Sequence, residues 1–366
     1  MEPGTGKTRT AIELVNSSDA DYLLFMTPCR NINNIHDEIE KWGCNIDYDV
    51  YGIESLSNSD RTLIKLMNTV ESHKSVFMIV DESLKIKNQS AIRTSRINDI
   101  GKKTEYRLIL NGTPLSKNII DVYSQMKFLS PKILKMDYES FINRYVQYIN
   151  YDIKSGSNFT KIKKFRNLDN LYSLISPFVY EARLSITPET NYIDETYQIT
   201  KYMEDYVETK YHYINMIFNS PNIFMAMTQS MQMAYCLEPS KFDIVDKYLD
   251  ENTIIFCKFI QSRNELIRRY PKTKILTYGT GSLGLNLQEY NQIIFFDKTF
   301  NYAQKEQAQR RIYRMGQNND CRFIDLTGNV GLEKFINKNI TNKTNLLDSF
   351  KTAIINDKTK VILDEL

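Results

Sequence analysis

The segment Gly4-Thr5-Gly6-Lys7-Thr8 has the residue types and spacing of a loop that binds the phosphates of a nucleotide. The two glycines allow a tight turn that brings backbone N–H groups toward an anion. Lys7 could reach the β- and γ-phosphates, and the Thr8 hydroxyl could bind Mg²⁺. Residues 9–15 have helix periodicity, so the loop is predicted to open a helix whose N-terminus favours negative charge. A chance glycine turn is the alternative for this segment taken alone.

Two adjacent acids follow a run of five apolar residues at 76–80. If that run is a strand of a parallel sheet, Asp81 and Glu82 lie at its carboxyl end, where ligands bind. Asp81 would then hold Mg²⁺ directly or through water, and Glu82 would polarise an attacking water molecule. A strand that ends in a solvated acidic turn is the alternative, and the phosphate loop upstream makes it less attractive.

Three more segments have residue types that could take part in the same nucleotide chemistry. Asn111–Leu115 is a Gly-Thr-Pro turn after a short apolar run, and Thr280–Leu287 is a second polar turn after a predicted strand. Further on, Arg311 and Arg314 are three residues apart, which would place them on one face of a helix. Two such arginines could stabilise the charge of a phosphoryl-transfer transition state, although a solvated basic helix face is the alternative.

The elements that position these residues are strands alternating with helices. Such alternation predicts βαβ units and parallel sheets, hence an α/β fold. The strands expected in the first part of the chain are Tyr22–Thr27, Asn45–Tyr51, Ser75–Val80 and Tyr106–Leu110, with helices near 31–42, 59–71, 89–99 and 119–128. Those expected in the last part are Thr253–Cys257, Lys274–Tyr278, Gln292–Asp297 and Cys321–Leu326, with helices near 240–250, 260–270, 303–314 and 331–340.

Length and composition suit a protein of two or three domains. The 366 residues are divided here into 1–125, a mainly helical 126–235, and 236–366. The net charge is only +3, so nucleic-acid binding would need a local basic face. The five cysteines form no C-x-x-C pair, which indicates reduced thiols in a cytoplasmic setting. No apolar run is long enough to cross a membrane.

Taken in order, these motifs resemble the Swi/Snf-type branch of the superfamily-two helicases, which are DNA-translocating ATPases. Glu2–Thr8 is similar to motif I, Thr27-Pro28 to motif Ia, and Asp81–Asn88 to the family's D-E-x-H-x-I-K-N motif II. Asn111–Leu115 is similar to motif III, Thr280–Leu287 to motif V, and Gln307–Gln317 to motif VI. The forms of motifs II and VI are the ones specific to this branch.

The resemblance implies two RecA-like lobes with a helical insert, which use ATP and Mg²⁺ to track along double-stranded DNA as a monomer. Gly4 to Thr8 and Asp81 would bind the nucleotide and metal, with Glu82, Arg311 and Arg314 as the catalytic residues. The other roles that it implies are nucleotide sensing by Gln309 and Gln317, DNA contact by Thr27, Pro28, Lys85, Lys87, Asn88, Thr280 and Gly281, and coupling by Gly112, Thr113, Pro114, Gly284 and Asn286. The basic cluster Lys161–Arg166 is a candidate auxiliary DNA contact.

The sequence departs from the family pattern at several points. Leu84 and Tyr313 stand where the family often has histidine. The short stretch before motif V predicts a reduced second lobe with about four main strands. No strand precedes the phosphate loop, so we expect either that the natural protein begins upstream or that the loop is weakly anchored. Heavy use of Asn, Ile, Lys and Tyr fits a compact phage or viral member of the family.

Two alternatives to a duplex-DNA translocase remain open. One is a helicase that separates strands, and the other is a DNA- or partner-binding remnant that does not hydrolyse ATP. The resemblance of Lys85–Asn88 to the Swi/Snf branch makes an enzyme directed at RNA a weaker hypothesis.

Overall fold

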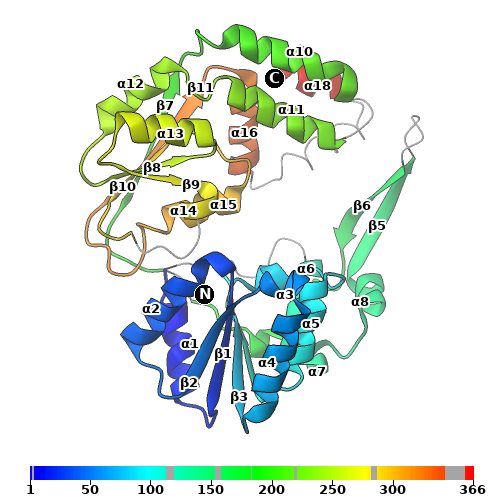
Figure 1. Cartoon of the computed structure of the whole chain (residues 1–366). Helices are drawn as coiled ribbons and strands as arrows, with labels where there is room; N and C mark the ends of the chain where they lie inside the picture. The colour runs from blue at the N-terminus through cyan, green and yellow to red at the C-terminus, as the bar shows by residue number, and fades with distance from the viewer. Residues whose placement is uncertain are drawn as a thin grey trace. The chain divides into compact units, whose positions relative to one another are not determined.

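The computed structural model describes residues 1, 4–112, 119–152, 158–182, 184–217, 221–281, 287–342 and 359–366. The chain divides into two compact units, Met1–Ser185 and Ile186–Leu366, which are described separately below (Figure 1). No helix among the described residues is long and apolar enough to span a bilayer.

A four-stranded parallel sheet in the order β2-β1-β3-β4 forms the centre of unit 1. β1 and β3 are buried on both faces, which explains why their sequences are unbroken apolar runs. The elements of this sheet and its connections are β1 (Tyr22–Thr27), β2 (Asp47–Gly52), β3 (Val76–Val80), β4 (Tyr106–Ile109), α1 (Lys7–Asn16), η1 (Cys29–Asn31), α2 (Ile32–Trp42), α3 (Ser55–Asn58), α4 (Asp60–Ser72), η2 (Ser83–Ile86), α5 (Ile92–Gly101) and α6 (Ile120–Leu129).

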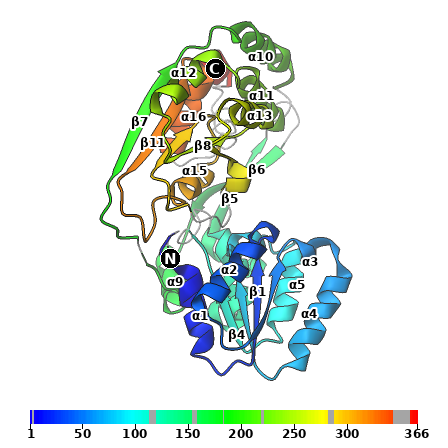
Figure 2. The same ribbon diagram turned by 60° about the vertical axis from the view of Figure 1, so that its left-hand side comes forward.

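Helices cover both faces of this sheet. Ala11 and Ile12 of α1 and Ile35 of α2 pack on one face, and α4, α5 and α6 pack on the other (Figure 1, Figure 2). In Figure 2, α1 and α4 flank β1 from opposite sides. The carboxyl ends of the parallel strands therefore form one edge between two helical layers, the edge at which α1 begins.

The rest of unit 1 contains a small helical core and a two-stranded antiparallel ribbon. Phe141 and Tyr145 are fully buried in this core and pack near Val122 and Tyr123 of α6. The additional elements are α7 (Pro131–Leu134), α8 (Tyr138–Tyr145), β5 (Val146–Asp152), β6 (Asn158–Phe165), α9 (Leu168–Ile175) and η3 (Ser176–Phe178).

Unit 2 is built on a five-stranded parallel sheet in the order β7-β11-β10-β8-β9. Alternate residues of β8 enter different cores, Ile255 with α11 and α16, and Ile254 with α15. Its elements are β7 (Thr190–Tyr197), α10 (Met203–Ile217), α11 (Pro221–Ala234), α12 (Pro239–Tyr248), β8 (Thr253–Cys257), α13 (Ile260–Arg269), β9 (Lys274–Thr277), α14 (Tyr278–Gly281), β10 (Gln292–Phe295), α15 (Tyr302–Gln309), β11 (Cys321–Gly328), α16 (Gly331–Thr341) and α18 (Thr359–Glu365).

The α/β fold with two parallel sheets is confirmed, and every strand expected from the sequence is present within two residues of its expected bounds. The expectation of four main strands in the second lobe was wrong, because β7 is a fifth strand paired with β11. β7 is an edge strand that carries Asp194 and Glu195, so it lacks the apolar run that marks the other strands. The division into 1–125, 126–235 and 236–366 stays a prediction, and the second segment contains β5, β6 and β7 besides helices.

Candidate functional site

The phosphate-loop residues lie at the start of the first helix, as the sequence predicted. α1 begins at Lys7, and Thr8 is in its first turn. Gly4 and Gly6 have φ angles of 85° and 79°, in the region that L side chains rarely adopt. The carbonyl oxygen of Gly6 accepts a hydrogen bond from the N–H of Thr10 at 2.9 Å, so helical bonding starts directly from the loop. The N–H groups of such a first turn lack helical acceptors, and an anion could bind them.

Asp81 lies at the carboxyl end of β3 and is only 8% exposed. Its N–H donates to the carbonyl of Met26 at 2.8 Å, and its Oδ2 accepts a long hydrogen bond of 3.4 Å from the Thr27 hydroxyl. Burial and then the neighbouring Glu82 charge raise the pKa of Asp81 to about 6, while the charge of Lys7 opposes the shift. The charge of Lys7 therefore favours the ionised form of Asp81.

Glu82 has a left-handed backbone, with φ 48° and ψ 51°. This conformation costs a residue other than glycine on the order of 1–2 kcal/mol, so the surrounding structure must hold it. Ser83 provides that hold, because its N–H donates to Leu110 at 3.0 Å and its hydroxyl donates to Oε1 of Gln125 at 2.6 Å. The turn leaves Glu82 half-buried directly beside Asp81, a position from which a carboxylate could polarise water.

The residues after this turn present positive charge at the surface. Lys85, Lys87 and Asn88 are all exposed, as a role in nucleic-acid binding requires. Lys85 pairs with Glu54 and Lys87 pairs with Asp121, each at 3.3 Å. Exposed ion pairs of this kind contribute about 0–1 kcal/mol, so either lysine could exchange its acid for a phosphate at little cost.

The other DNA contact predicted in unit 1, at Thr27 and Pro28, is not exposed as Lys85 and Lys87 are. Thr27 and Pro28 are both buried, so neither presents its side chain to a nucleic acid. Thr27 instead orients Asp81. The exposed residues that follow are Cys29 and Arg30, and Arg30 offers a basic group that was not among the predicted contacts. Its signal was present, because it comes three residues after the end of an apolar strand.

A cavity of about 720 Å³ lies beside β4, which is the edge strand of the described sheet. Thr10 and Leu14 of α1 line one side of the cavity, and Met126 of α6 lines another. Lys7 also lines this cavity, so this side of α1 has no packing partner at this point among the described residues. Gly112, predicted as a coupling residue, is buried just beyond β4, and Thr113 and Pro114 lie outside the described residues.

Motif VI of unit 2 differs from its expected form. A helix was expected over 303–314, but α15 ends at Gln309 and the chain continues in turns, with Tyr313 N–H donating to the Gln309 carbonyl at 3.0 Å. Arg311 and Arg314 are half-buried in these turns, so the helix-face argument for pairing them was wrong. Their catalytic role stays a prediction.

The motif V residues are only partly described. Thr280 and Gly281 form the end of α14, while Gly284 and Asn286 lie outside the described residues.

Gln317 is 4% exposed, and its amide is used entirely within unit 2. Its Nε2 donates to the carbonyls of Gln288, Tyr290 and Ile312 at 3.2, 2.9 and 3.2 Å. Its Oε1 accepts two backbone N–H groups at 3.0 Å. The structure therefore gives this glutamine a loop-fixing position, and its predicted nucleotide sensing gains no support.

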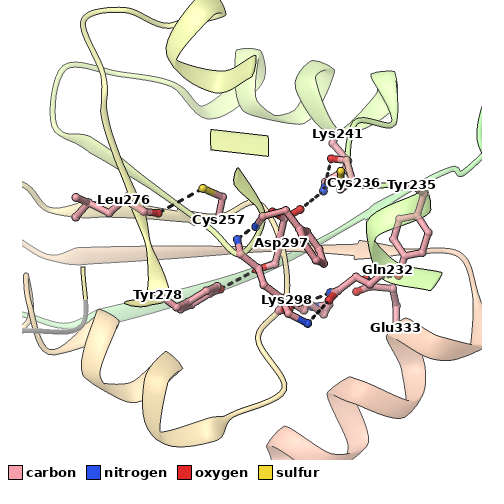
Figure 3. Close-up of polar contacts among 12 residues, drawn as sticks. Gln232, Tyr235, Cys236, Lys241, Cys257, Leu276, Tyr278, Asp297, Lys298 and Glu333 are labelled. Carbon is pink, nitrogen blue, oxygen red and sulfur yellow. Dashed lines mark hydrogen bonds and ion pairs between the residues drawn. The ribbon is translucent and has the colours of Figure 1, made fainter. Parts of the chain in front are cut away.

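A buried polar cluster around Asp297 lies at the carboxyl edge of the second sheet (Figure 3). Oδ1 of Asp297 pairs with Nζ of Lys241 at 2.6 Å, and both side chains are almost fully buried. Oδ2 accepts the N–H groups of Lys258 and Phe259 at 3.0 and 3.4 Å, at the start of α13. The Tyr278 hydroxyl donates to the Asp297 carbonyl at 2.8 Å. This aspartate thus joins β10 to α12, α13 and α14.

The Lys258 ammonium extends the same cluster. It donates to Oε1 of Gln232 at 2.8 Å and lies 3.2 Å from the ring centroid of Phe300. Burial lowers the pKa of Lys258 to about 7, and the charges of Asp297 and Glu333 oppose the shift. No motif in the sequence predicted this cluster, although Asp297 follows an apolar run just as Asp81 does.

A phosphate-binding loop that opens a helix, beside an acid at the end of a parallel strand, is typical of P-loop α/β proteins. The family model for the SNF2-related domain matches residues 2–241, and the chain belongs to that family.

Similar proteins come from yeasts and a fly. The chain is 24% identical to the SWI/SNF chromatin-remodeling complex subunit snf22 of Schizosaccharomyces pombe, over 93% of the chain and 26% of that protein. It is 22% identical to the nuclear protein STH1/NPS1 of Saccharomyces cerevisiae, over 92% of the chain and 32% of that protein. It is also 22% identical to the ATP-dependent helicase brm of Drosophila melanogaster, over 89% of the chain and 26% of that protein. The chain thus spans about a quarter to a third of these relatives.

Proposed function

We propose that this chain is an ATP-dependent motor that translocates on double-stranded DNA. The observation that carries the proposal is the geometry of the loop, in which Gly4 and Gly6 have positive φ angles directly before α1, together with the buried Asp81 at the carboxyl end of β3. Membership of the SNF2-related domain family and the names of the relatives, which include an ATP-dependent helicase and chromatin-remodeling subunits, support the same conclusion.

In this proposal the nucleotide is ATP with Mg²⁺. The loop N–H groups and Lys7 would bind the phosphates, while Thr8 and Asp81 would hold the metal, which would neutralise phosphate charge. Glu82 polarises the attacking water, and the half-buried Arg311 and Arg314 stabilise charge in the transition state. Thr8 lies in the first turn of α1, and Asp81 follows the last residue of β3. Both side chains offer oxygen atoms, the ligands that a hard cation prefers.

The proposed partner is the phosphate backbone of duplex DNA, bound by a monomer. Exposed Lys85 and Lys87 follow the acids of β3, and Arg30 follows β1, so basic residues come after two neighbouring strands of one sheet. Phosphate contacts of this kind carry no base specificity, which fits a protein that moves along DNA.

The test is the rate of ATP hydrolysis with and without duplex DNA. We expect duplex DNA to stimulate hydrolysis, and we expect Lys7→Ala and Glu82→Gln to lower the stimulated rate by about 10²-fold or more, as loss of a charge-stabilising group in a catalytic site does. Lys74→Ala and Glu13→Gln are matched controls, because both residues are exposed in the same unit. These two variants should keep the full rate.

Other outcomes identify the alternatives. Stimulation by single strands but not by duplex DNA would favour a helicase that separates strands. A second candidate, a DNA- or partner-binding remnant that does not hydrolyse ATP, is favoured by one observation, the cavity beside β4 that leaves α1 partly unsupported near Lys7. Weak or undetectable ATP binding with no turnover, in a chain that still binds DNA, would support that candidate.

A further inference from the structure

The ribbon of β5 and β6 extends from the helices of unit 1 as an arm (Figure 1). The sequence of this arm and its base, from Arg144 to Arg166, contains six basic residues and one acidic residue, Asp152. The excess of basic over acidic residues in this segment is larger than the net charge of +3 on the whole chain. The arm is therefore the local basic feature that the overall composition hides.

A β-bulge decides which way the basic side chains of β6 point. Gln147 pairs with Lys164, but the next residue, Tyr148, pairs with Ile162, which leaves Lys163 without a partner in the register. Ile162 and Phe165 can both pack against the helical core although they are three residues apart. In a regular strand they would face opposite sides, because side chains alternate.

The consequence of the bulge is a pair of adjacent lysines in solvent. Lys163 and Lys164 are both exposed, whereas regular alternation would turn one of them toward the core. Within the described residues, no ion pair joins either lysine to an acid. The bulge thus concentrates positive charge on one side of the arm.

The base of the arm is held firmly, which an isolated two-stranded ribbon needs. The Arg166 guanidinium donates to the carbonyls of Asn143 and Val146 at 2.8 and 3.3 Å, and its N–H donates to Tyr145 at 2.8 Å. Asn167 adds a side-chain bond to the Arg144 carbonyl at 3.0 Å. Arg166 is therefore used structurally, and Lys163 and Lys164 are the cations offered to a ligand.

We propose that the arm is an auxiliary DNA-binding element, in which Lys163 and Lys164 contact two backbone phosphates of duplex DNA. This inference rests on the proposed function for its choice of ligand. Duplex DNA presents one negative charge per about 1.7 Å of helix axis, so two neighbouring ammonium groups meet separate phosphates. Lysine suits this task because it is a compact point charge with three donors.

The experiment measures the affinity of the full chain for a labelled duplex between about 50 and 200 mM salt. The slope of log K against log salt is negative, and each lost phosphate contact reduces its magnitude by about 0.9. Lys163→Ala/Lys164→Ala should therefore reduce the magnitude of the slope by about 1.8. The affinity deficit of this variant should then be about tenfold larger at the low salt concentration than at the high one. The DNA-free ATPase rate should stay unchanged.

Three further variants make the result specific. Deletion of Lys163 removes the bulge and leaves Ile162 and Phe165 two positions apart, so the core contacts survive and the slope should fall by only about 0.9. Lys163→Arg/Lys164→Arg should keep the wild-type slope. Lys272→Ala/Lys274→Ala, which removes two exposed lysines near the amino end of β9 in unit 2, should also keep it.

The two proposals fail separately. A wild-type slope in Lys163→Ala/Lys164→Ala, with unchanged circular dichroism and with ATPase still stimulated by duplex DNA, would overturn the arm proposal alone. A reduced slope in a protein whose ATPase does not respond to DNA would support the arm and refute the motor. Equal loss of slope in the Lys272/Lys274 control would also overturn the arm proposal, because the effect would then be one of total charge.

Discussion

Replacement of Lys258 by methionine should stabilise unit 2 in a way that depends on pH. The wild-type ammonium is enclosed beside Gln232 and Phe300, and burial lowers its pKa from 10.5 to about 7. In the unfolded chain the pKa returns to its usual value. Between pH 7 and 10.5 the unfolded state therefore binds a proton that the folded state lacks, and the free energy of unfolding rises with pH. The cost of burying the charge is fully present below about pH 7.

The magnitude follows from the two pKa values. From pH 6.5 to pH 8.5 the free energy of unfolding of the wild type should rise by about 2 kcal/mol through this group alone. Since Lys258 keeps part of its surface in solvent, this value is an upper bound. Lys258→Met lacks the titrating group, so its stability relative to the wild type should be greater at pH 6.5 than at pH 8.5 by up to that amount. The variant also loses the hydrogen bond to Gln232. This loss lowers its free energy of unfolding equally at pH 6.5 and pH 8.5, so it cancels in the difference between the two pH values.

The assay is denaturant unfolding at the two pH values. The single tryptophan, Trp42, is in unit 1, so its fluorescence follows unit 1, while far-ultraviolet circular dichroism follows both units. The mutation should move the dichroism transition and leave the Trp42 transition in place. Lys272→Met, at an exposed lysine of the same unit, should show no change with pH. A stability difference between Lys258→Met and wild type that is the same at both pH values would refute the reasoning.

Two further predictions concern the phosphate loop and motif VI. Gly6→Ala and Gly43→Ala each place a side chain at a positive φ, 79° and 76°, where an added Cβ meets no atom within 4 Å. Each should therefore lower the free energy of unfolding by about 1–2 kcal/mol through backbone strain, as measured by equilibrium unfolding. Only Gly6→Ala should also weaken ATP binding, and equal weakening by both variants would contradict the assignment of the phosphate loop. Gln317→Leu leaves three carbonyls without their donor and should destabilise unit 2 by about 1–3 kcal/mol. Thermal unfolding measures this loss, and Asn318→Ala, at an exposed neighbour, is the control. A Gln317→Leu variant that is as stable as the wild type but has lost ATP-dependent activity would favour the nucleotide-sensing role instead.

Local sequence patterns predicted much of the fold. The bounds of β1 and β8 were predicted without error, because both are buried on both faces and their apolar runs end where the strands end. The start of α1 was also predictable, since Gly4 and Gly6 mark a backbone that only glycine adopts easily. The position of Asp81 at a strand end needed only the run before it.

The same patterns failed where distant residues decide the outcome. The edge strand β7 is polar, and its partner β11 lies more than 120 residues downstream, so no local run identified it. The length of α15 was overestimated because periodicity continues past Gln309, while the chain turns there to bury Ile312 and Gln317.

By itself, the sequence determined the order of the motifs, the α/β class and the residues that could bind phosphate, because these depend on residue type and short spacing. Only the tertiary structure decided how those residues are used. It buried Thr27 against Asp81, committed Gln317 to three carbonyls, and enclosed Lys241 with Asp297. It also turned Lys163 and Lys164 to one side through a bulge. Burial and pairing between distant segments set these outcomes, and no local pattern encodes them.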